Sequence, residues 1–141
     1  MLPAEDNNSK NRFTKHDRLK SPLAIEVLYR ENQRIVSYPL KCYYSFSERK
    51  ETETPVRVAF TVPKKSFKKA VERNKLKRRM REAYRLNFRK ILEEHISQND
   101  KQLRLFFIFI GKEMAEYQSI EMNLKAILQK IEKKYIFAPP F

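Results

Sequence analysis

The candidate functional residues of this sequence are basic side chains at helical spacing. Residues 64–90 hold thirteen Lys or Arg and two Glu, within a chain of 141 residues that has 31 basic and 17 acidic residues and a net charge of +14. One row along a helix, at intervals of three or four residues, consists of Asn74, Arg78, Arg81, Arg85 and Arg89. Like charges at that spacing repel, so the row indicates a compensating anion. Because arginine forks match phosphate oxygens, it predicts binding to a nucleic acid.

Protein-based catalysis is not indicated by any grouping of side chains. A nuclease that acts without RNA needs clustered carboxylates or a paired histidine, whereas the acids here are dispersed and His16 and His95 have no evident partner. The only cysteine is Cys42 and the only glycine is Gly111, which excludes a zinc site, a disulfide framework and a glycine-rich phosphate loop. The sequence therefore predicts no catalytic residue, and no metal or other cofactor bound by the protein alone.

The basic row belongs to one predicted domain over residues 12–137, between a disordered tail at 1–11 and a short tail at 138–141. Hydrophobic periodicity predicts, in chain order, a helix over 22–32, strands over 37–47 and 55–62, a helix over 67–95, a strand over 103–110 and a helix over 119–135. The predicted fold class is thus an α+β sandwich with the order α-β-β-α-β-α.

Local signals mark where these elements begin and end. Ser21 followed by Pro22 is typical of a helix start, and Ser66 is expected to cap the long helix. The charged stretch 48–54 is interpreted as a hairpin loop between the first two strands. Gly111 is expected to end the strand at 103–110, whose apolar run is typical of a central strand covered on both faces.

Alternation along the first two strands predicts a sheet with one apolar and one mixed face. The apolar face, on which the side of the long helix around Leu76 and Met80 packs, consists of Tyr38, Leu40, Cys42, Tyr44, Phe46, Val56, Val58, Phe60 and Val62. The opposite face consists of Lys41, Tyr43, Ser45, Arg57, Ala59 and Thr61. Small residues leave room there and Tyr43 offers a stacking plane, which suits an extended single strand of nucleic acid.

No segment of the sequence has the pattern of a membrane span or a signal peptide. The longest apolar run, 105–110, is six residues long, whereas a helix needs about 20 to cross a bilayer. The first residues are acidic and polar, without the apolar segment of a signal peptide. We therefore expect a cytoplasmic protein with no membrane partner.

One sixteen-residue segment resembles the signature helix of the bacterial ribonuclease P protein component. It runs from Ala70 to Arg85 and reads AVERNKLKRRMREAYR. Lys75 stands where the family has arginine, which keeps the charge and loses the bidentate fork. Upstream, FTVPKK at 60–65 is similar to the family's strand end, and RFTK at 12–15 with RLKS at 18–21 is similar to its entry into the first helix.

The resemblance implies a fold, an RNA partner and separate roles for the RNA and the protein. The fold would be that of ribosomal protein S5 domain 2, with a left-handed βαβ crossover over 55–110. The catalyst would be a large RNA that uses Mg²⁺ to release the 5′ leader of precursor tRNA, so the protein would be the accessory subunit of an endoribonuclease. It would contact that RNA through Lys64, Lys65, Arg73, Asn74, Lys75, Lys77, Arg78, Arg81 and Arg85. It would hold the leader in a cleft between the first helix and the sheet, lined by Phe13, Ile25, Tyr29, Lys41, Tyr43 and Arg57.

Two aspects of this interpretation stay open. The family places an aromatic residue on the first helix facing the cleft; Ile25 occupies that position here, and either Tyr29 supplies the ring instead or it belongs to the core. A structural RNA-binding protein, such as a ribosomal protein, would share the composition and the basic helix. A DNA-binding domain is disfavoured, because the helix is basic along its length and has few Asn or Gln side chains to contact base edges.

Overall fold

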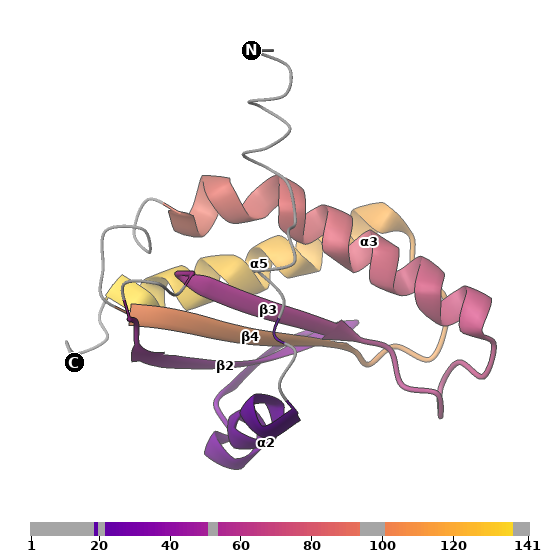
Figure 1. Cartoon of the computed structure of the whole chain (residues 1–141). Coiled ribbons are helices and arrows are strands. Elements are labelled where there is room, and N and C mark those ends of the chain that lie inside the picture. Colours follow the sequence, from indigo (N-terminus) through magenta and orange to yellow (C-terminus); the bar gives the residue numbers. More distant parts are fainter. Residues whose placement is uncertain (1–18, 20–21, 51–53, 94–100, 137–141) are drawn as a thin grey trace, which may run out of the picture.

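The computed structural model describes residues 19, 22–50, 54–93 and 101–136, which form one four-stranded sheet with helices on both faces (Figure 1). In chain order the elements are α2 (Pro22–Glu31), β1 (Arg34–Ser37), β2 (Leu40–Glu48), β3 (Val56–Thr61), α3 (Ala70–Phe88), the π-helical turn η2 (Arg89–Glu93), β4 (Lys101–Phe109) and α5 (Tyr117–Ile136). Helices α3 and α5 lie on one face and α2 lies on the other (Figure 1). The α+β class is confirmed, with one strand more than predicted. The tails predicted at 1–11 and 138–141 lie outside the described residues.

The strands lie in the order β1-β2-β4-β3. Strand β2 pairs antiparallel with β4, from Leu40 opposite Phe109 to Glu48 opposite Lys101, and β3 pairs with β4 in parallel. The predicted hairpin over 48–54 is therefore wrong, because β4 lies between the two strands that it was to join. A parallel pair needs a long crossover connection, which α3 supplies between β3 and β4.

The single strand predicted over 37–47 is in fact two strands. Strand β1 pairs antiparallel with β2, and the turn between them is formed by Tyr38 and Pro39. Tyr38, expected in the core, is 66% exposed because it lies in that turn. Pro39 has no N–H to donate to a sheet, which explains why pairing stops there. Its carbonyl oxygen instead accepts a hydrogen bond of 2.8 Å from the N–H of Ile110.

Helix α3 begins at Ala70, so Ser66 does not cap it. The N–H groups of Ser66 and Phe67 both donate to the carbonyl oxygen of Pro63, at 3.2 Å, and form a turn instead. Phe67 is buried in the core, which holds the loop against the body of the molecule. The residue that precedes the helix is Lys69, and its side chain makes no capping hydrogen bond.

At its other end α3 gives way to η2 after Phe88, so Arg89 belongs to η2. His95, the predicted end of the long helix, lies outside the described residues. Helix α5 agrees with the prediction to within two residues at its start and one at its end. Within the described part of the chain, no helix combines the length and the apolar character needed to cross a bilayer.

Two apolar clusters lie on opposite sides of the sheet. The main core, between the sheet and helices α3 and α5, has among its fully buried side chains Leu76, Met80, Leu105, Phe107 and Leu124. The second core, between the sheet and α2, consists of Leu19, Leu28, Tyr43, Phe106 and Ile108. Leu19 also donates its backbone N–H to the carbonyl oxygen of Val58 in β3, at 2.8 Å. Helix α2 is thus fixed over one sheet face, which we call the α2 face.

Candidate nucleic-acid interface

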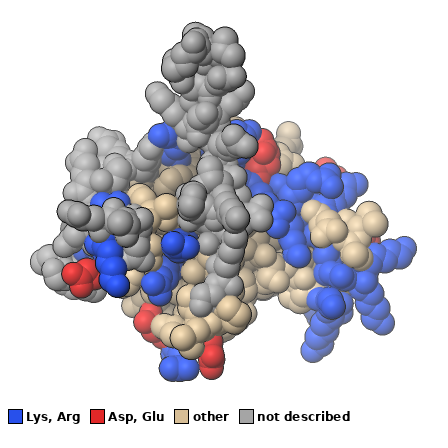
Figure 2. Space-filling view, viewed as in Figure 1, with Lys and Arg blue, Asp and Glu red and all other residues tan. Residues whose placement is uncertain are grey.

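Exposed cations gather over α3 and the loop that leads into it. Figure 2 shows Lys and Arg side chains concentrated on the right of the molecule, where Figure 1 places that loop and the N-terminal half of α3. We call this region the basic surface; its exposed residues are Lys64, Lys65, Lys68, Lys69, Asn74, Lys75, Arg78 and Arg81. Six of the nine predicted RNA-binding residues belong to it. The other three, Arg73, Lys77 and Arg85, are partly buried.

The start of α3 adds backbone donors to this surface. The first N–H groups of a helix have no partner within the helix and favour anions. No side chain caps the helix at Lys69, and the first turn contains one acid, Glu72. Lys64 and Lys65 are exposed just before it. The arrangement is suited to phosphate groups along the N-terminal half of α3.

Arg73 connects the helix to the preceding loop. Its Nη1 atom donates hydrogen bonds of 2.8 Å to the carbonyl oxygens of both Phe67 and Lys68. These two bonds explain how the loop stays ordered without a side-chain cap. Arg73 therefore positions the lysines of the loop, whatever else its remaining donors bind.

Two further arginines of α3 make contacts within the protein. Arg79 Nη1 donates to the carbonyl oxygen of Ala115, at 2.5 Å. Arg85 forms a two-pronged contact with Glu82, with Nε to Oε2 at 3.1 Å and Nη2 to Oε1 at 2.6 Å. These hydrogen bonds lower the pKa of Glu82 and raise that of Arg85. Arg85 is thus paired with the carboxylate of Glu82. The exposed cations of the basic surface lie in the half of α3 that precedes it.

A polar contact joins α3 to α5 behind the basic surface. The buried Asn87 donates through Nδ2 to the carbonyl oxygen of Ala83, at 2.7 Å, and to Glu121 Oε2, at 3.1 Å. The hydroxyl of Tyr117 donates to the same carboxylate oxygen, also at 3.1 Å. Burial, followed by this hydrogen bond to Glu121, raises the pKa of Tyr117 to about 12. The contact sets the position of α3 against α5.

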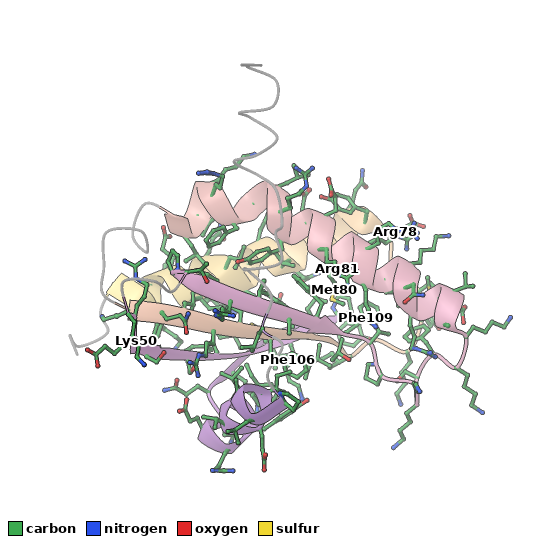
Figure 3. The ribbon with its side chains drawn as sticks, viewed as in Figure 1. Lys50, Arg78, Met80, Arg81, Phe106 and Phe109 are labelled. Atoms are coloured by element: carbon green, nitrogen blue, oxygen red, sulfur yellow. The ribbon has the colours of Figure 1, made fainter. Side chains whose placement is uncertain are left out.

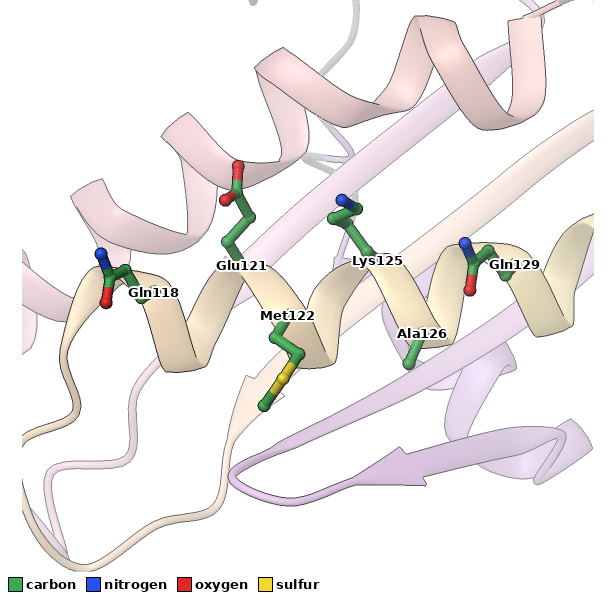
Figure 4. A pocket seen from close by; sticks show the side chains of 6 residues that line it. All are labelled: Gln118, Glu121, Met122, Lys125, Ala126 and Gln129. Atoms are coloured by element: carbon green, nitrogen blue, oxygen red, sulfur yellow. The ribbon is translucent and has the colours of Figure 1, made fainter.

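The outer side of α5 bears an open depression of about 370 Å³ (Figure 4). Its lining residues are Gln118, Glu121, Met122, Lys125, Ala126 and Gln129. Glu121 is the one carboxylate among them, and it already accepts the two hydrogen bonds described above. The depression therefore offers no carboxylate pair and no hydroxyl or thiol nucleophile, and we do not take it as a candidate active site.

The α2 face differs from expectation at Tyr43. Its side chain points to the predicted face, in register with Phe106 of β4. However, the residue is only 7% exposed, because it belongs to the second core beneath α2. The alternation of the strand predicted the face correctly but could not show that α2 would cover it. The expectation that Tyr43 offers an open stacking plane is therefore wrong.

Tyr29 supplies the accessible ring on this face. It is 46% exposed and packs against Tyr43 in a tilted arrangement, with ring centroids 4.7 Å apart. Its ring is also nearly perpendicular to that of Phe106, with centroids 5.7 Å apart. Burial, followed by the proximity of Tyr43, raises the pKa of its hydroxyl. Tyr29 is therefore not enclosed in the core, and it presents an aromatic surface to solvent; its role in holding a leader stays a prediction.

The remaining predicted cleft residues are distributed around this aromatic pair. Lys41 places its Nζ atom 5.3 Å from the centroid of the Tyr43 ring, at a distance typical of a cation–π contact. Ile25 packs against the second core, partly buried. Arg57 lies on the α2 face and is also partly buried. Phe13 lies outside the described residues.

Sequence reasoning missed Arg104. This residue of β4 lies opposite Ser45 of β2 and Arg57 of β3, so all three share one row on the α2 face. Its Nε donates to Gln102 Oε1 at 3.1 Å, and Gln102 Nε2 donates to the carbonyl oxygen of Thr54 at 3.0 Å. The signal was the spacing of Gln102 and Arg104, two polar residues on one side of an otherwise apolar strand.

The described residues present no group of three or more His, Cys, Asp or Glu that could ligate a metal ion. Cys42 is fully buried on the core face, as expected, and burial raises the pKa of its thiol. A buried thiol of this kind behaves as a small apolar side chain.

Known proteins resemble this chain in sequence and in fold. The profile of the family described as Ribonuclease P matches residues 13–132. A Porphyromonas gingivalis protein named Ribonuclease P protein component is 30% identical over 120 residues, covering 84% of this chain and 85% of that protein. A Chlorobaculum tepidum protein of the same name is 38% identical over 91 residues, covering 61% of this chain and 59% of its own length. The solved structure of Staphylococcus aureus RNase P protein has a similar fold, with a TM-score of 0.60 at 24% identity, covering 86% of this chain and 99% of that one.

Proposed function

The chain belongs to the ribonuclease P protein family, and from this premise we propose that its basic surface binds the catalytic RNA while its α2 face binds the 5′ leader of precursor tRNA. As the protein component of ribonuclease P, it takes part in tRNA processing as a partner of the ribonuclease P RNA. In this proposal the basic surface and the α2 face each bind a different RNA.

The exposed cations of the basic surface are the observation that carries the proposal. Arg78, Lys75 and the loop lysines are all exposed, next to an uncapped helix start. Phosphate contacts of this kind supply most of the affinity of a protein for structured nucleic acid, without dependence on sequence. A folded RNA with closely spaced phosphates is the polyanion that fits such a surface.

The α2 face supports the assignment of the leader. Tyr29 offers one aromatic plane to solvent, and Lys41 and Arg57 lie on the same face. Single-stranded RNA is bound in this way, through bases stacked on aromatic rings and a backbone held by cations. Figure 3 shows Phe106 near α2 and Arg78 on α3, which lies across the sheet. The two ligands therefore approach the protein from different sides.

In this proposal the protein supplies binding and the RNA supplies the chemistry. Mg²⁺ takes oxygen ligands, usually water and phosphate together with one or two carboxylates. Among the described residues, no three or more His, Cys, Asp or Glu side chains gather into a group that could hold a metal ion. The residues that the structure describes therefore do not fit a magnesium site of their own, and we assign the ion to the RNA subunit. The protein then acts by orienting the precursor tRNA on the RNA and by offsetting the repulsion between their phosphates.

Reconstitution with the cognate RNA subunit tests the proposal. At low Mg²⁺ concentration, where repulsion between the two RNAs is least screened by metal ions, the protein is expected to increase the rate of precursor-tRNA cleavage and to have no activity alone. Arg78→Ala is expected to reduce this stimulation, whereas Lys130→Ala on α5 serves as a charge-matched control. A protein that binds the RNA but gives no stimulation would be a purely structural RNA-binding protein, and that result would contradict the proposal.

A further inference from the structure

An ion pair lies at the end of the row of cations on α3. Arg85 follows Arg81 by one helical turn on the same side of the helix. Its Nε and Nη2 atoms donate to the two carboxylate oxygens of Glu82, at 3.1 and 2.6 Å. A two-pronged contact of this kind uses the same edge of the guanidinium group that would bind a phosphate. Glu82 therefore occupies the atoms through which Arg85 would contact RNA.

Glu82 has two arginines within reach along the helix. Arg78 precedes it by four residues and Arg85 follows it by three, and both spacings bring side chains together. An acid that precedes its basic partner is in the more favourable order. Both carboxylate oxygens are accordingly turned to Arg85, and Arg78 has no ion pair or hydrogen bond among the described residues. The carboxylate thus neutralises one arginine of the row and leaves the more exposed one open.

A second carboxylate lies near this ion pair. The hydroxyl of Tyr117 donates to Glu121 of α5, and burial, followed by this hydrogen bond, raises the pKa of Tyr117 to about 12. The charges of Glu82 and Arg85 also act on the Tyr117 hydroxyl, with opposite signs. Glu82, Glu121 and Arg85 are therefore close together, and the three groups carry a net negative charge. This point of α3 differs in sign from the basic surface that precedes it.

We propose that Glu82 is a specificity-determining residue, which withholds Arg85 from phosphates and so ends the RNA-binding row of α3 at Arg81; this inference rests on the proposed function of the basic surface. A carboxylate held on the same helix is always beside its partner, whereas an RNA phosphate must displace it and approach a second acid. The paired Arg85 is thereby removed from the set of cations that RNA can use.

The consequence is a preference for one RNA over RNA in general. Any RNA can use an additional exposed cation, because phosphate contacts do not depend on sequence. Confining the open cations to one half of α3 favours an RNA whose folded phosphates match that half. Specificity of this kind arises by weakening the wrong complex as well as by strengthening the right one.

The first experiment measures the affinity of the full chain for the catalytic RNA and for a short RNA duplex of arbitrary sequence, at several salt concentrations. Glu82→Gln is expected to bind the duplex roughly fivefold to tenfold more tightly, because it frees one arginine for a charge-assisted contact. The slope of log K against log salt should become steeper by about 1. Affinity for the catalytic RNA should rise less, so the preference for that RNA should fall.

Glu72→Gln is the matched control. It removes the same charge from the same helix, and Glu72 has no ion pair among the described residues, so the change frees no arginine. It should leave the salt slope unchanged. Glu82→Ala, which cannot hydrogen-bond to Arg85, should repeat the effect of Glu82→Gln. Urea unfolding of each variant establishes that the fold is retained.

The second experiment repeats these measurements with Arg85→Ala. In that background Glu82→Gln should change the duplex affinity no more than Glu72→Gln does, because no arginine is left to free. Arg85→Ala alone should bind the catalytic RNA about as tightly as the wild type, whereas Arg78→Ala should lose affinity. A merely structural role of the ion pair would not produce a change in salt slope that depends on Arg85.

Two kinds of result would overturn the inference. A gain from Glu82→Gln that equals that of Glu72→Gln, or that persists without Arg85, would show a general effect of charge. A loss in Arg85→Ala as large as that in Arg78→Ala would show that Arg85 binds the catalytic RNA in spite of Glu82. If instead Arg78→Ala bound the catalytic RNA as tightly as the wild type, the proposed function of the basic surface would fail, and the duplex measurements would still decide the role of Glu82.

Discussion

The guanidinium group of Arg79 donates a hydrogen bond of 2.5 Å to the carbonyl oxygen of Ala115, and this bond ties α3 to the segment that leads into α5. The preceding residue, Arg78, is exposed on the basic surface. Successive residues of a helix point about 100° apart, so two neighbouring arginines serve different purposes. One holds the helix in place and the other is open to a ligand.

The pair predicts opposite effects of two alanine substitutions. Arg78→Ala should weaken binding of the catalytic RNA by roughly fivefold to tenfold, because one charge-assisted phosphate contact is lost, and leave stability unchanged. Arg79→Ala should lower the free energy of unfolding by about 1–2 kcal/mol and have the smaller effect on RNA affinity. Urea unfolding and filter binding of both variants would separate these roles. Equal losses of affinity would mean that Arg79 also contacts the RNA.

Binding of the catalytic RNA should depend steeply on salt. If five to seven phosphates are neutralised, log K should fall against log salt with a slope of roughly −4 to −6. Arg78→Ala should make the slope shallower by about 1, as expected for the loss of one phosphate contact. Titrations at several salt concentrations would measure both slopes. A flat response would show that the basic surface is not where the RNA binds.

Two tyrosines on the α2 face should respond differently to substitution. Tyr29→Ala should weaken binding of precursor tRNA by ~1–3 kcal/mol and spare mature tRNA, which has no leader to stack on the ring. Tyr43→Ala should instead lower the free energy of unfolding by about 3–5 kcal/mol, since it removes a ring from the second core. Tyr38→Ala is the matched control, because this exposed tyrosine lies in the β1–β2 turn. Loss of mature-tRNA binding in Tyr29→Ala would contradict a role in leader recognition.

The ion pair of Glu82 and Arg85 predicts a small effect of pH on stability. The folded pKa of Glu82 lies below the ordinary value of 4.5, so its contribution is present above pH 4.5 and is lost as pH falls through the folded pKa. The contribution should be less than about 1 kcal/mol, because both side chains are open to solvent screening. Wild type and Glu82→Gln should therefore differ in urea unfolding at neutral pH and converge in acid. A difference that persists in acid would point to another cause.

The sequence predicted correctly which face of a helix or strand a residue lies on, but not which of those faces another element would cover. The buried side of α3 around Leu76 and Met80, and the alternate faces of β2 and β3, follow from spacing alone. By contrast, nothing in the spacing of Tyr43 shows that α2 will lie over it. Coverage depends on tertiary packing between segments that are distant in the sequence.

The partners of charged residues were likewise predictable only where they lie close in the sequence. Glu82 and Arg85 are three residues apart on one helix, so their pairing could have been expected. The partner of Arg79 is a backbone carbonyl 36 residues away, and a side chain's charge carries no information about such a partner. The turn at Pro39 was missed because the alternation of apolar residues continues through it, although a proline without an N–H was a signal against a paired strand.

The central place of β4 has a consequence for how the chain is made. Within the sheet, β3 pairs with β4 alone, and β2 meets β4 through residues as far apart in sequence as Leu40 and Phe109. While the nascent chain emerges from the ribosome, β2 and β3 have no strand between them until residues 101–109 are released. Pairing over such sequence separations is slow, because a long loop must close first. Until then β2 and β3 each keep open the edge that β4 will occupy, and the four-stranded sheet can form only after β4 has been made.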